Sequence, residues 1–422
     1  MTWSRITWQD SPSTATPVSA ANLNRIESAI DDLNGGALVT RTIRHTNGGL
    51  GGTVTSSLAA GTAGSSRFVV KLPVDVTQWR FMIRNRDTAE TAKTAATLKK
   101  LVVGLHSPPS TSDNTGSETG SFSGSTATTI VSTDQTIPGD GTWYTSPWVT
   151  SAPGLFTANT EYLVAFGWTF ASSTAVQTGA GKAWTWTTST SGTDPTVAGS
   201  GGTVTSIPFD WIIEYQSTSR RKVCLVIGDS IFEPIAGARG TSSASIVPTP
   251  LWKGNVYLWA AATNRLIVNM SLAGWKLSDY ATALSNASVA HIWDRLALDT
   301  FTLDEVLICG GSNDIFGASA TLAGLQASVR TLVSRLQTTY SFTGKVYLGT
   351  VISRTSTGDS VRLSYNDWIG GQPTFCNGVV DFAGAMRGTS STALWPDYTT
   401  DTIHPSWLGH QRMADELAVA IP

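Results

Sequence analysis

Residues 222–230, with the sequence KVCLVIGDS, determine how the second half of the chain is interpreted. Lys222–Ile227 is a nearly continuous apolar run, and Gly228, Asp229 and Ser230 follow it directly. A short apolar run that ends in a glycine is typical of a strand buried on both faces of a parallel sheet. A serine at the turn after such a strand can expose its hydroxyl at the positive end of the next helix. The same tripeptide is also typical of an ordinary turn.

Strand-like runs recur downstream, and helical patterns lie between them. The runs are Arg265–Met270, Glu305–Cys309, Lys345–Ile352 and Gly378–Phe382. The clearest helical pattern repeats apolar residues on one face at Leu322, Leu325, Val329, Leu332, Val333 and Leu336. A last helix is predicted from about Ser406 to Ala420. Strands that alternate with helices predict a doubly wound α/β domain with a five-stranded parallel sheet, whose active site lies at the carboxyl ends of the strands.

Three more features stand at the ends of these predicted elements. Gly274 follows the second strand, Asn313 follows the third, and Asp401 and His404 stand immediately before the last helix. A carboxylate three residues before a histidine can accept a hydrogen bond from the ring and hold one tautomer, as the acid of a nucleophilic triad does. Each feature also has a purely structural interpretation: a glycine at the start of a helix, an Asx turn and a capping pair.

Taken in order, the four features closely resemble the sequence blocks of the SGNH-hydrolase superfamily, the GDSL-type esterases and lipases. The resemblance covers residues 221–422 and implies a three-layer, flavodoxin-like α/β fold for the domain predicted at 219–422. It implies that Ser230 is the nucleophile, His404 the general base and Asp401 the residue that orients it. The oxyanion hole would consist of the Ser230 N–H, the Gly274 N–H and the Asn313 side chain.

The chain departs from this family at one point. A glycine often follows the serine by a few residues in the family, whereas here the sequence reads Ile231-Phe232-Glu233-Pro234. We expect the difference to affect access of the substrate more than the chemistry. His410, six residues after His404, is expected to be structural.

Residues 38–218 are predicted to form an all-β sandwich, with a jelly roll as one candidate topology. The strand-like runs are Phe68–Leu72, Trp79–Arg84, Leu101–Leu105, Glu161–Phe170 and Phe209–Tyr215. The Ser/Thr/Gly-rich connector from Ser107 to about Thr136 is expected to be a mobile surface loop, and Glu90–Lys100 a short helical insertion. Five tryptophans either line a sugar-binding face or pack in the core and at its edges: Trp143, Trp148, Trp168, Trp184 and Trp186.

The composition is that of an extracellular type of protein. Only 14% of the 422 residues are charged, and the chain holds 40 glycines and 16 tryptophans. The net charge is −2, and residues 101–219 contain a single lysine and no arginine, so we expect no nucleic-acid partner. No run approaches the ~20 apolar residues of a membrane span. Residues 1–11 lack the apolar segment of a signal peptide, which conflicts with the extracellular composition.

Cysteine and metal chemistry are not expected. Cys224 and Cys309 lie in apolar strand-like runs, and with Cys376 they make an odd number. Buried free thiols are therefore favoured over a disulfide framework. No group of His, Asp, Glu and Cys residues has the spacing of metal ligands, and we expect no metal or other cofactor.

Residues 1–37 are predicted to be a leader with a helix from Ser19 to about Asn34. Leu23, Ile26, Ile30 and Leu33 repeat over two heptads, which fits either a helix packed on the body or a seam for self-association. The stretch Thr16–Glu27, after Trp8-Gln9-Asp10, looks like the amino-terminal segment of tailed-phage minor tail and tail-fibre proteins. That resemblance implies attachment to other phage tail proteins, a homotrimer, and a virion location that needs no signal peptide.

Two functions are consistent with these observations. The first is a virion-associated serine esterase that removes acyl groups, with acetyl expected, from host cell-surface polysaccharide. It rests on the four blocks with their complete Ser230, His404 and Asp401 set. The second is a receptor-binding tail protein that holds host glycan without hydrolysing it, and it rests on the leader and the tryptophans. A secreted bacterial esterase with a carbohydrate-binding module is a weaker third reading, because no signal peptide is visible.

Overall fold

The computed structural model describes most of the chain from Thr40 onward. The described residues are 40–46, 55–58, 62–85, 93–107, 121–124, 127–171, 174–188, 193–196, 203–219, 221–233, 254–282, 293, 303–354, 358–390, 392–399 and 401–422. The leader predicted at 1–37 lies outside them. Among the described residues, no helix is both long enough and apolar enough to cross a membrane.

The C-terminal half is a three-layer α/β domain around a five-stranded parallel sheet, as predicted. Its strands are β13 (Lys222–Gly228), β14 (Arg265–Asn269), β15 (Glu305–Cys309), β16 (Lys345–Gly349) and β17 (Gly378–Val380). Their order in the sheet is β14-β13-β15-β16-β17, and all four pairings are parallel. This is the flavodoxin-like order, in which a ligand crevice forms where the chain changes direction, here between β13 and β15.

Helices cover both faces of this sheet. They are α2 (Asn255–Thr263), α3 (Leu277–Thr282), α5 (Ser312–Ala318), α6 (Leu322–Thr339), α7 (Asp359–Gly370), α8 (Phe382–Ala385) and α9 (Trp407–Ala420), with the 3-10 turn η2 (Pro396–Tyr398). Alternate residues of β13 divide between two cores. Leu225 packs in the core that holds α6, and Val226 packs in the one that holds α2 and α9. The apolar run of β13 is therefore buried on both faces, as its sequence predicts.

The predicted helices form where their sequence signals stand. α6 begins after Thr321, whose hydroxyl accepts from the Gly324 N–H, and its predicted apolar face is buried except for the partly exposed Leu322. α9 begins after Ser406, whose hydroxyl accepts from the Gly409 N–H. Both are side-chain N-caps of the type that fixes the first turn of a helix.

The N-terminal half consists of antiparallel sheets that pack as a sandwich. One sheet has the order β1-β12-β4-β8, and the other has the order β11-β10-β3-β9-β5-β6, with β2 and β7 beside it. The strands are β1 (Thr40–Thr46), β2 (Thr55–Leu58), β3 (Ala63–Lys71), β4 (Gln78–Arg84), β5 (Ala96–Leu105), β6 (Thr128–Val131), β7 (Gln135–Ile137), β8 (Tyr144–Thr145), β9 (Glu161–Thr169), β10 (Thr174–Thr188), β11 (Thr203–Pro208) and β12 (Asp210–Thr218).

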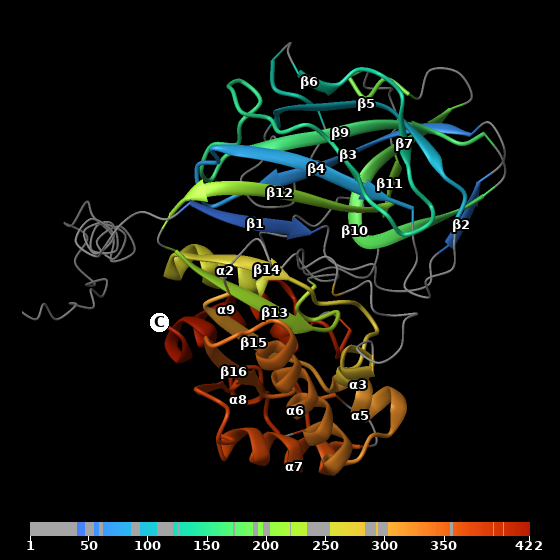
Figure 1. Ribbon diagram of the computed structural model, residues 1–422. Coiled ribbons are helices and arrows are strands. Elements are labelled where there is room, and N and C mark those ends of the chain that lie inside the picture. The colour runs from blue at the N-terminus through green and yellow to red at the C-terminus, as the bar shows by residue number, and fades with distance from the viewer. Residues whose placement is uncertain are drawn as a thin grey trace, which may run out of the picture.

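Four antiparallel pairs are nested along the chain, which is the pattern of a jelly roll. The outermost pair is β1 with β12, followed by β3 with β9, β4 with β8 and β5 with β6. Aromatic side chains from both sheets fill the core, where the rings of Phe68 and Trp211 stack with centroids 3.9 Å apart. In Figure 1 the sandwich lies above the parallel sheet, and β1 is next to β14.

Three expectations for the sandwich need correction. The helix predicted at Glu90–Lys100 is wrong for residues 96–100, which open strand β5. The connector predicted as a loop contains β6 and β7, which pair with β5. Trp168 is 1% exposed in the core and cannot line a sugar-binding face. Trp143 and Trp148 are half-buried and stack on Arg84 and Arg80, and the side chains of Trp184 and Trp186 lie outside the described residues.

Candidate active site

The turn after β13 is held close to the neighbouring strand. A Cβ atom on Gly228 would lie 2.9 Å from the backbone oxygen of Cys309 in β15, so only glycine fits without a shift. The Gly228 carbonyl accepts from the Tyr280 hydroxyl at 2.9 Å and from the Leu272 N–H at 3.2 Å. These contacts fix the position from which Ser230 leaves the sheet.

Ser230, His404 and Asp401 lie in a single hydrogen-bonded line. His404 Nε2 is 2.9 Å from Ser230 Oγ, and His404 Nδ1 is 2.7 Å from Asp401 Oδ2. Ser230 is 7% exposed, whereas the Asp401 side chain is 47% exposed. A carboxylate on Nδ1 favours the tautomer that carries its proton there, which leaves Nε2 free to accept the serine proton.

The loop before α9 is shaped by Asp401 itself. Its Oδ1 accepts from the N–H groups of Ile403 at 3.0 Å and His404 at 2.7 Å. Partial burial opposes ionisation of Asp401, but the hydrogen bonds from the His404 ring and from these two N–H groups outweigh it and hold its pKa below the usual value. Asp401 is therefore ionised at neutral pH and bound to the histidine that it orients.

The segment with Gly274 is bonded to the serine turn at two further points. The Glu233 carboxylate accepts from the Ala273 N–H, and the Asn269 side chain donates to the Phe232 carbonyl at 2.9 Å. Gly274 has φ +74°, in the left-handed region that favours glycine. Glu233, which lies in the stretch where the family often has a glycine, thus supports the Gly274 segment, a role that the sequence did not suggest.

Asn313 and Asp314 reach the same segment from α5. The Asn313 side-chain N–H₂ donates to the Trp275 carbonyl at 3.0 Å. The Asp314 carboxylate accepts from the N–H groups of Leu277 at 2.8 Å and Ser278 at 3.1 Å. Ser230, His404 and Asp401 are therefore joined in one line, and the segments that carry Gly274 and Asn313 are bonded to each other and to the serine turn.

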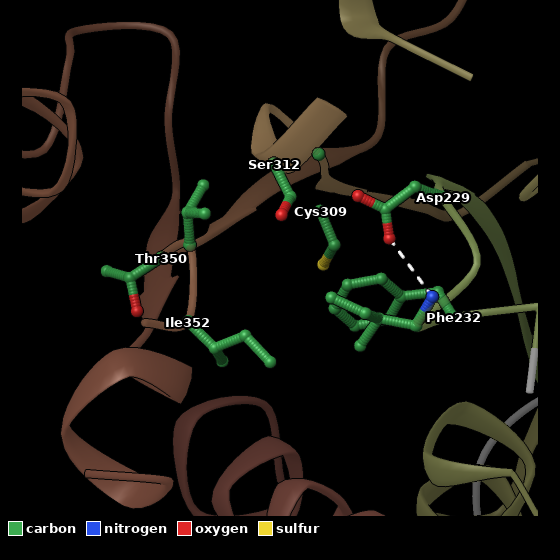
Figure 2. A pocket seen from close by; sticks show the side chains of 9 residues that line it. Asp229, Phe232, Cys309, Ser312, Thr350 and Ile352 are labelled. Atoms are coloured by element: carbon green, nitrogen blue, oxygen red, sulfur yellow. Dashed lines mark hydrogen bonds between the residues drawn. The ribbon is translucent and has the colours of Figure 1, made fainter. Parts of the chain in front are cut away.

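A cavity of about 10 Å³, large enough for about one water molecule, lies beneath the serine turn. Figure 2 shows the carboxylate of Asp229 and the hydroxyl of Ser312 among its lining side chains. Burial raises the pKa of Asp229 to about 6, against the opposing hydrogen bond from the Ile231 N–H and the positive charge of Arg354. The sequence placed Asp229 in the GDS tripeptide but gave no signal for this environment.

The three cysteines and His410 are the other groups that the sequence singled out. Cys224, Cys309 and Cys376 are buried and free, as predicted, and burial raises the pKa of each thiol. His410 is 2% exposed within α9, where its N–H donates to the Ser406 carbonyl. Cys224 Sγ donates to the Leu225 carbonyl at 3.6 Å and Cys376 Sγ donates to the Gly378 carbonyl at 3.0 Å.

A serine–histidine–aspartate line at the carboxyl edge of a flavodoxin-like sheet defines the class of α/β serine hydrolases. In agreement, residues 226–412 match the family model of the GDSL-like lipase/acylhydrolase family. The C-terminal half of the chain therefore holds a GDSL-like lipase/acylhydrolase domain. Comparison with curated protein sequences gives no match.

Solved structures give weaker similarities. A family two carbohydrate esterase from Clostridium thermocellum, in complex with cellohexaose, has 12% sequence identity and a TM-score of 0.37, over 89% of this chain and 97% of that one. A carbohydrate esterase family 2 enzyme with a carbohydrate binding domain, from Corynascus thermopiles, has 12% identity and a TM-score of 0.38, over 90% and 98%. A GDSL-like lipase from Bacteroides thetaiotaomicron has 15% identity and a TM-score of 0.33, over 46% and 85%.

Proposed function

We propose that this protein is a serine esterase that hydrolyses carboxylic esters through Ser230, His404 and Asp401. The observation that carries the proposal is the continuous line from Asp401 Oδ2 to His404 Nδ1 and from His404 Nε2 to Ser230 Oγ, at 2.7 and 2.9 Å. Such a line activates an otherwise weak nucleophile, because the histidine accepts the serine proton as the oxygen attacks.

The reaction follows from these contacts in two halves. Ser230 Oγ bonds to the ester carbonyl carbon while its proton passes to His404 Nε2, and the carbonyl oxygen becomes an oxyanion. When the tetrahedral adduct collapses, the bond to the alcohol oxygen breaks and His404 returns the proton to that oxygen. Water, deprotonated by His404, then attacks the acyl-enzyme, and the acid leaves as Ser230 regains its proton.

The oxyanion would be held by the N–H of Ser230, the N–H of Gly274 and the side chain of Asn313. The amide of Asn313 carries two N–H bonds on Nδ2, and one of them binds the Trp275 carbonyl. The other is available to an oxyanion beside Ser230. Removal of one such donor commonly costs on the order of 10²- to 10³-fold in kcat.

For the substrate, we propose acyl groups, chiefly acetyl, on host cell-surface polysaccharide, with the protein acting as part of a phage tail. This finer proposal is supported by the leader sequence, including Thr16–Glu27, and by the low charge of residues 101–219. The leader would attach the protein to other tail proteins and assemble it as a homotrimer.

The test measures acetate release from p-nitrophenyl acetate by the purified chain. We expect turnover by the wild type and by Ser364→Ala, which removes an exposed hydroxyl on α7, but none above background by Ser230→Ala. Equal rates for Ser230→Ala and the wild type would show that Ser230 is not the nucleophile.

Acetate release from purified wall polysaccharides of candidate hosts then tests the proposed substrate. A wild type that binds these glycans but hydrolyses no ester would instead favour the receptor-binding function.

A further inference from the structure

Arg354 is a half-buried cation next to Asn313, and no salt bridge joins it to a carboxylate in the described part of the chain. Its neighbour Ser353, in the segment that follows β16, is 2% exposed. Of the five buried arginines among the described residues, four have a carboxylate at 2.6–2.8 Å: Arg44 with Glu214, Arg84 with Asp210, Arg265 with Glu305 and Arg362 with Asp359. The fifth, Arg67, donates from Nε to the Pro195 carbonyl at 3.0 Å. Taking a cation out of water is costly unless it is paired, so a half-buried arginine that binds an amide oxygen instead of a carboxylate calls for a function.

The hydrogen bond that Arg354 forms in the described residues goes to the candidate oxyanion residue. Its Nη2 donates to Asn313 Oδ1 at 3.3 Å, and its guanidinium lies 5.3 Å from the ring of Phe316, on the same helix as Asn313. The Nε of Arg354 is buried and has no hydrogen-bond partner among the residues that the structure describes. The side chain is thus held against α5 and directed at the amide of Asn313.

Two neighbours with opposite chemistry decide which way the Asn313 amide faces. A guanidinium can only donate, so it selects the oxygen of the amide, and a backbone carbonyl can only accept, so Trp275 selects the nitrogen. If the amide rotated by half a turn, a donor would face a donor and an acceptor an acceptor. With both contacts in place, the second N–H of Nδ2 has a defined direction.

We infer that Arg354 is a positioning residue that sets the orientation of the Asn313 amide and thereby prepares its N–H for the oxyanion. The inference rests on the proposed esterase function and adds a residue that the Ser230, His404 and Asp401 line does not include. Without Arg354, the Trp275 carbonyl alone would oppose rotation of the Asn313 amide.

The charge of Arg354 acts in the same direction. Burial lowers the pKa of Arg354 from its ordinary value, while the nearby Asp229 and Asp401 carboxylates raise it again, and the guanidinium stays protonated at any pH of assay. Asp229 is also influenced by the charges of Asp314, which is buried on α5, and of His404, and the Cys309 thiol lines the same cavity. A fixed positive charge on the carbonyl side of the Asn313 amide polarises its N–H bonds, which strengthens them toward an anion.

The test is a double-mutant cycle between Arg354→Met and Asn313→Ala, with p-nitrophenyl acetate as the probe. We expect Arg354→Met to lower kcat by roughly 10- to 100-fold with little change in KM. This fall in kcat is no larger than the fall expected when a whole oxyanion donor is removed. Arg354→Lys, which keeps a charged donor, should recover part of the activity. Arg330→Met, which removes an exposed arginine from α6, is the matched control and should keep wild-type kcat.

The cycle separates this inference from its alternatives. In the Asn313→Ala background, Arg354→Met should cost less than about twofold more, because the group it orients is absent. Losses that multiply in the double variant, or an Arg354→Met enzyme with unchanged kcat, would overturn the inference. If Arg354→Met does not fold, Arg354→Lys in both backgrounds gives the same comparison. An inactive wild type would refute the esterase function itself, which the Arg354 variants do not address.

Discussion

The carboxylate of Asp314 in α5 accepts a hydrogen bond from the backbone N–H of Leu277, at the start of α3, at 2.8 Å. It also accepts from the N–H and the hydroxyl of Ser278, at 3.1 and 2.9 Å. The segment that follows β14 is thus tied to the helix that follows β15. Since Gly274 lies on one side of this tie and Asn313 on the other, Asp314 fixes the distance between two of the proposed oxyanion donors.

We therefore predict that Asp314→Ala lowers kcat by up to about 10²-fold, because small displacements of catalytic groups have effects of this size. The variant should also lose about 1–3 kcal/mol of stability, since buried N–H groups of α3 lose their acceptor. Steady-state kinetics and urea unfolding measure the two effects. Asp367→Ala, at an exposed position on α7, is the control and should change neither. Wild-type kcat in a measurably destabilised Asp314→Ala would show that the tie is structural only.

Asp401→Asn tests the tautomer argument. Asn can keep the acceptor for the Ile403 and His404 N–H groups, but it cannot present a carboxylate to the ring. We expect kcat to fall by as much as about 10⁴-fold, the size of effect known for the same change in a serine protease. Because the Asp401 side chain is 47% exposed, the unfolding temperature should stay within a few degrees of the wild type. If Asp401→Asn retains a tenth or more of wild-type kcat, contacts other than the Asp401 carboxylate must orient the His404 ring.

Asp229 gives a prediction for stability against pH. Its pKa is raised from 3.8 to about 6 by burial, so between these values the folded protein binds more protons at Asp229 than the unfolded chain does. Stability must then fall as the pH rises through this window, by up to about 3 kcal/mol. Asp229→Asn removes the titration while keeping an acceptor for the Ile231 N–H.

Calorimetry of Asp229→Asn and the wild type at a series of pH values checks this prediction. We expect Asp229→Asn to be the more stable protein at pH 7 to 8, and the difference to vanish below about pH 4, where Asp229 is protonated in both states. A difference that is independent of pH would mean that the carboxyl does not titrate in this range.

The sequence predicted the Ser230 site because each of its residues carries a local signal. Ser230, Asn313 and His404 are far apart in the chain, but each follows a strand or precedes a helix, and carboxyl ends of parallel strands meet at one edge of a sheet. Arg354 has no such signal. In the sequence it is an isolated arginine a few residues after a strand. Its contact with Asn313 depends on β16 lying next to β15, and no local pattern of residues predicts that order of strands.

The failed prediction at 90–100 has a different cause. Ala and Lys in this stretch favour a helix locally. In the folded chain, however, Ala96 and Leu98 are buried on one face of β5, where Leu98 is opposite Trp168 of β9. Burial against a neighbouring strand overrides a preference of a few tenths of a kcal/mol per residue, and a neighbour 70 residues away is invisible to a local pattern.

Gly228 gives a prediction about how closely the nucleophile turn must approach the sheet. In Gly228→Ala the new methyl group would lie 2.9 Å from the Cys309 carbonyl oxygen, which is backbone of the adjacent strand and can move only if the β13–β15 pairing is disturbed. We expect a loss of about 1–3 kcal/mol in stability, together with a fall in kcat as Ser230 moves away from His404.

Gly317→Ala is the matched control for Gly228→Ala, because a methyl group at Gly317 meets no atom within 4 Å. Since Gly317 lies in α5, the change to alanine should stabilise the protein by about 0.4–1 kcal/mol and leave kcat unchanged. Thermal unfolding and steady-state kinetics of the two variants should therefore change in opposite directions, and equal stability of Gly228→Ala and the wild type would show that the strand yields to the methyl group without cost.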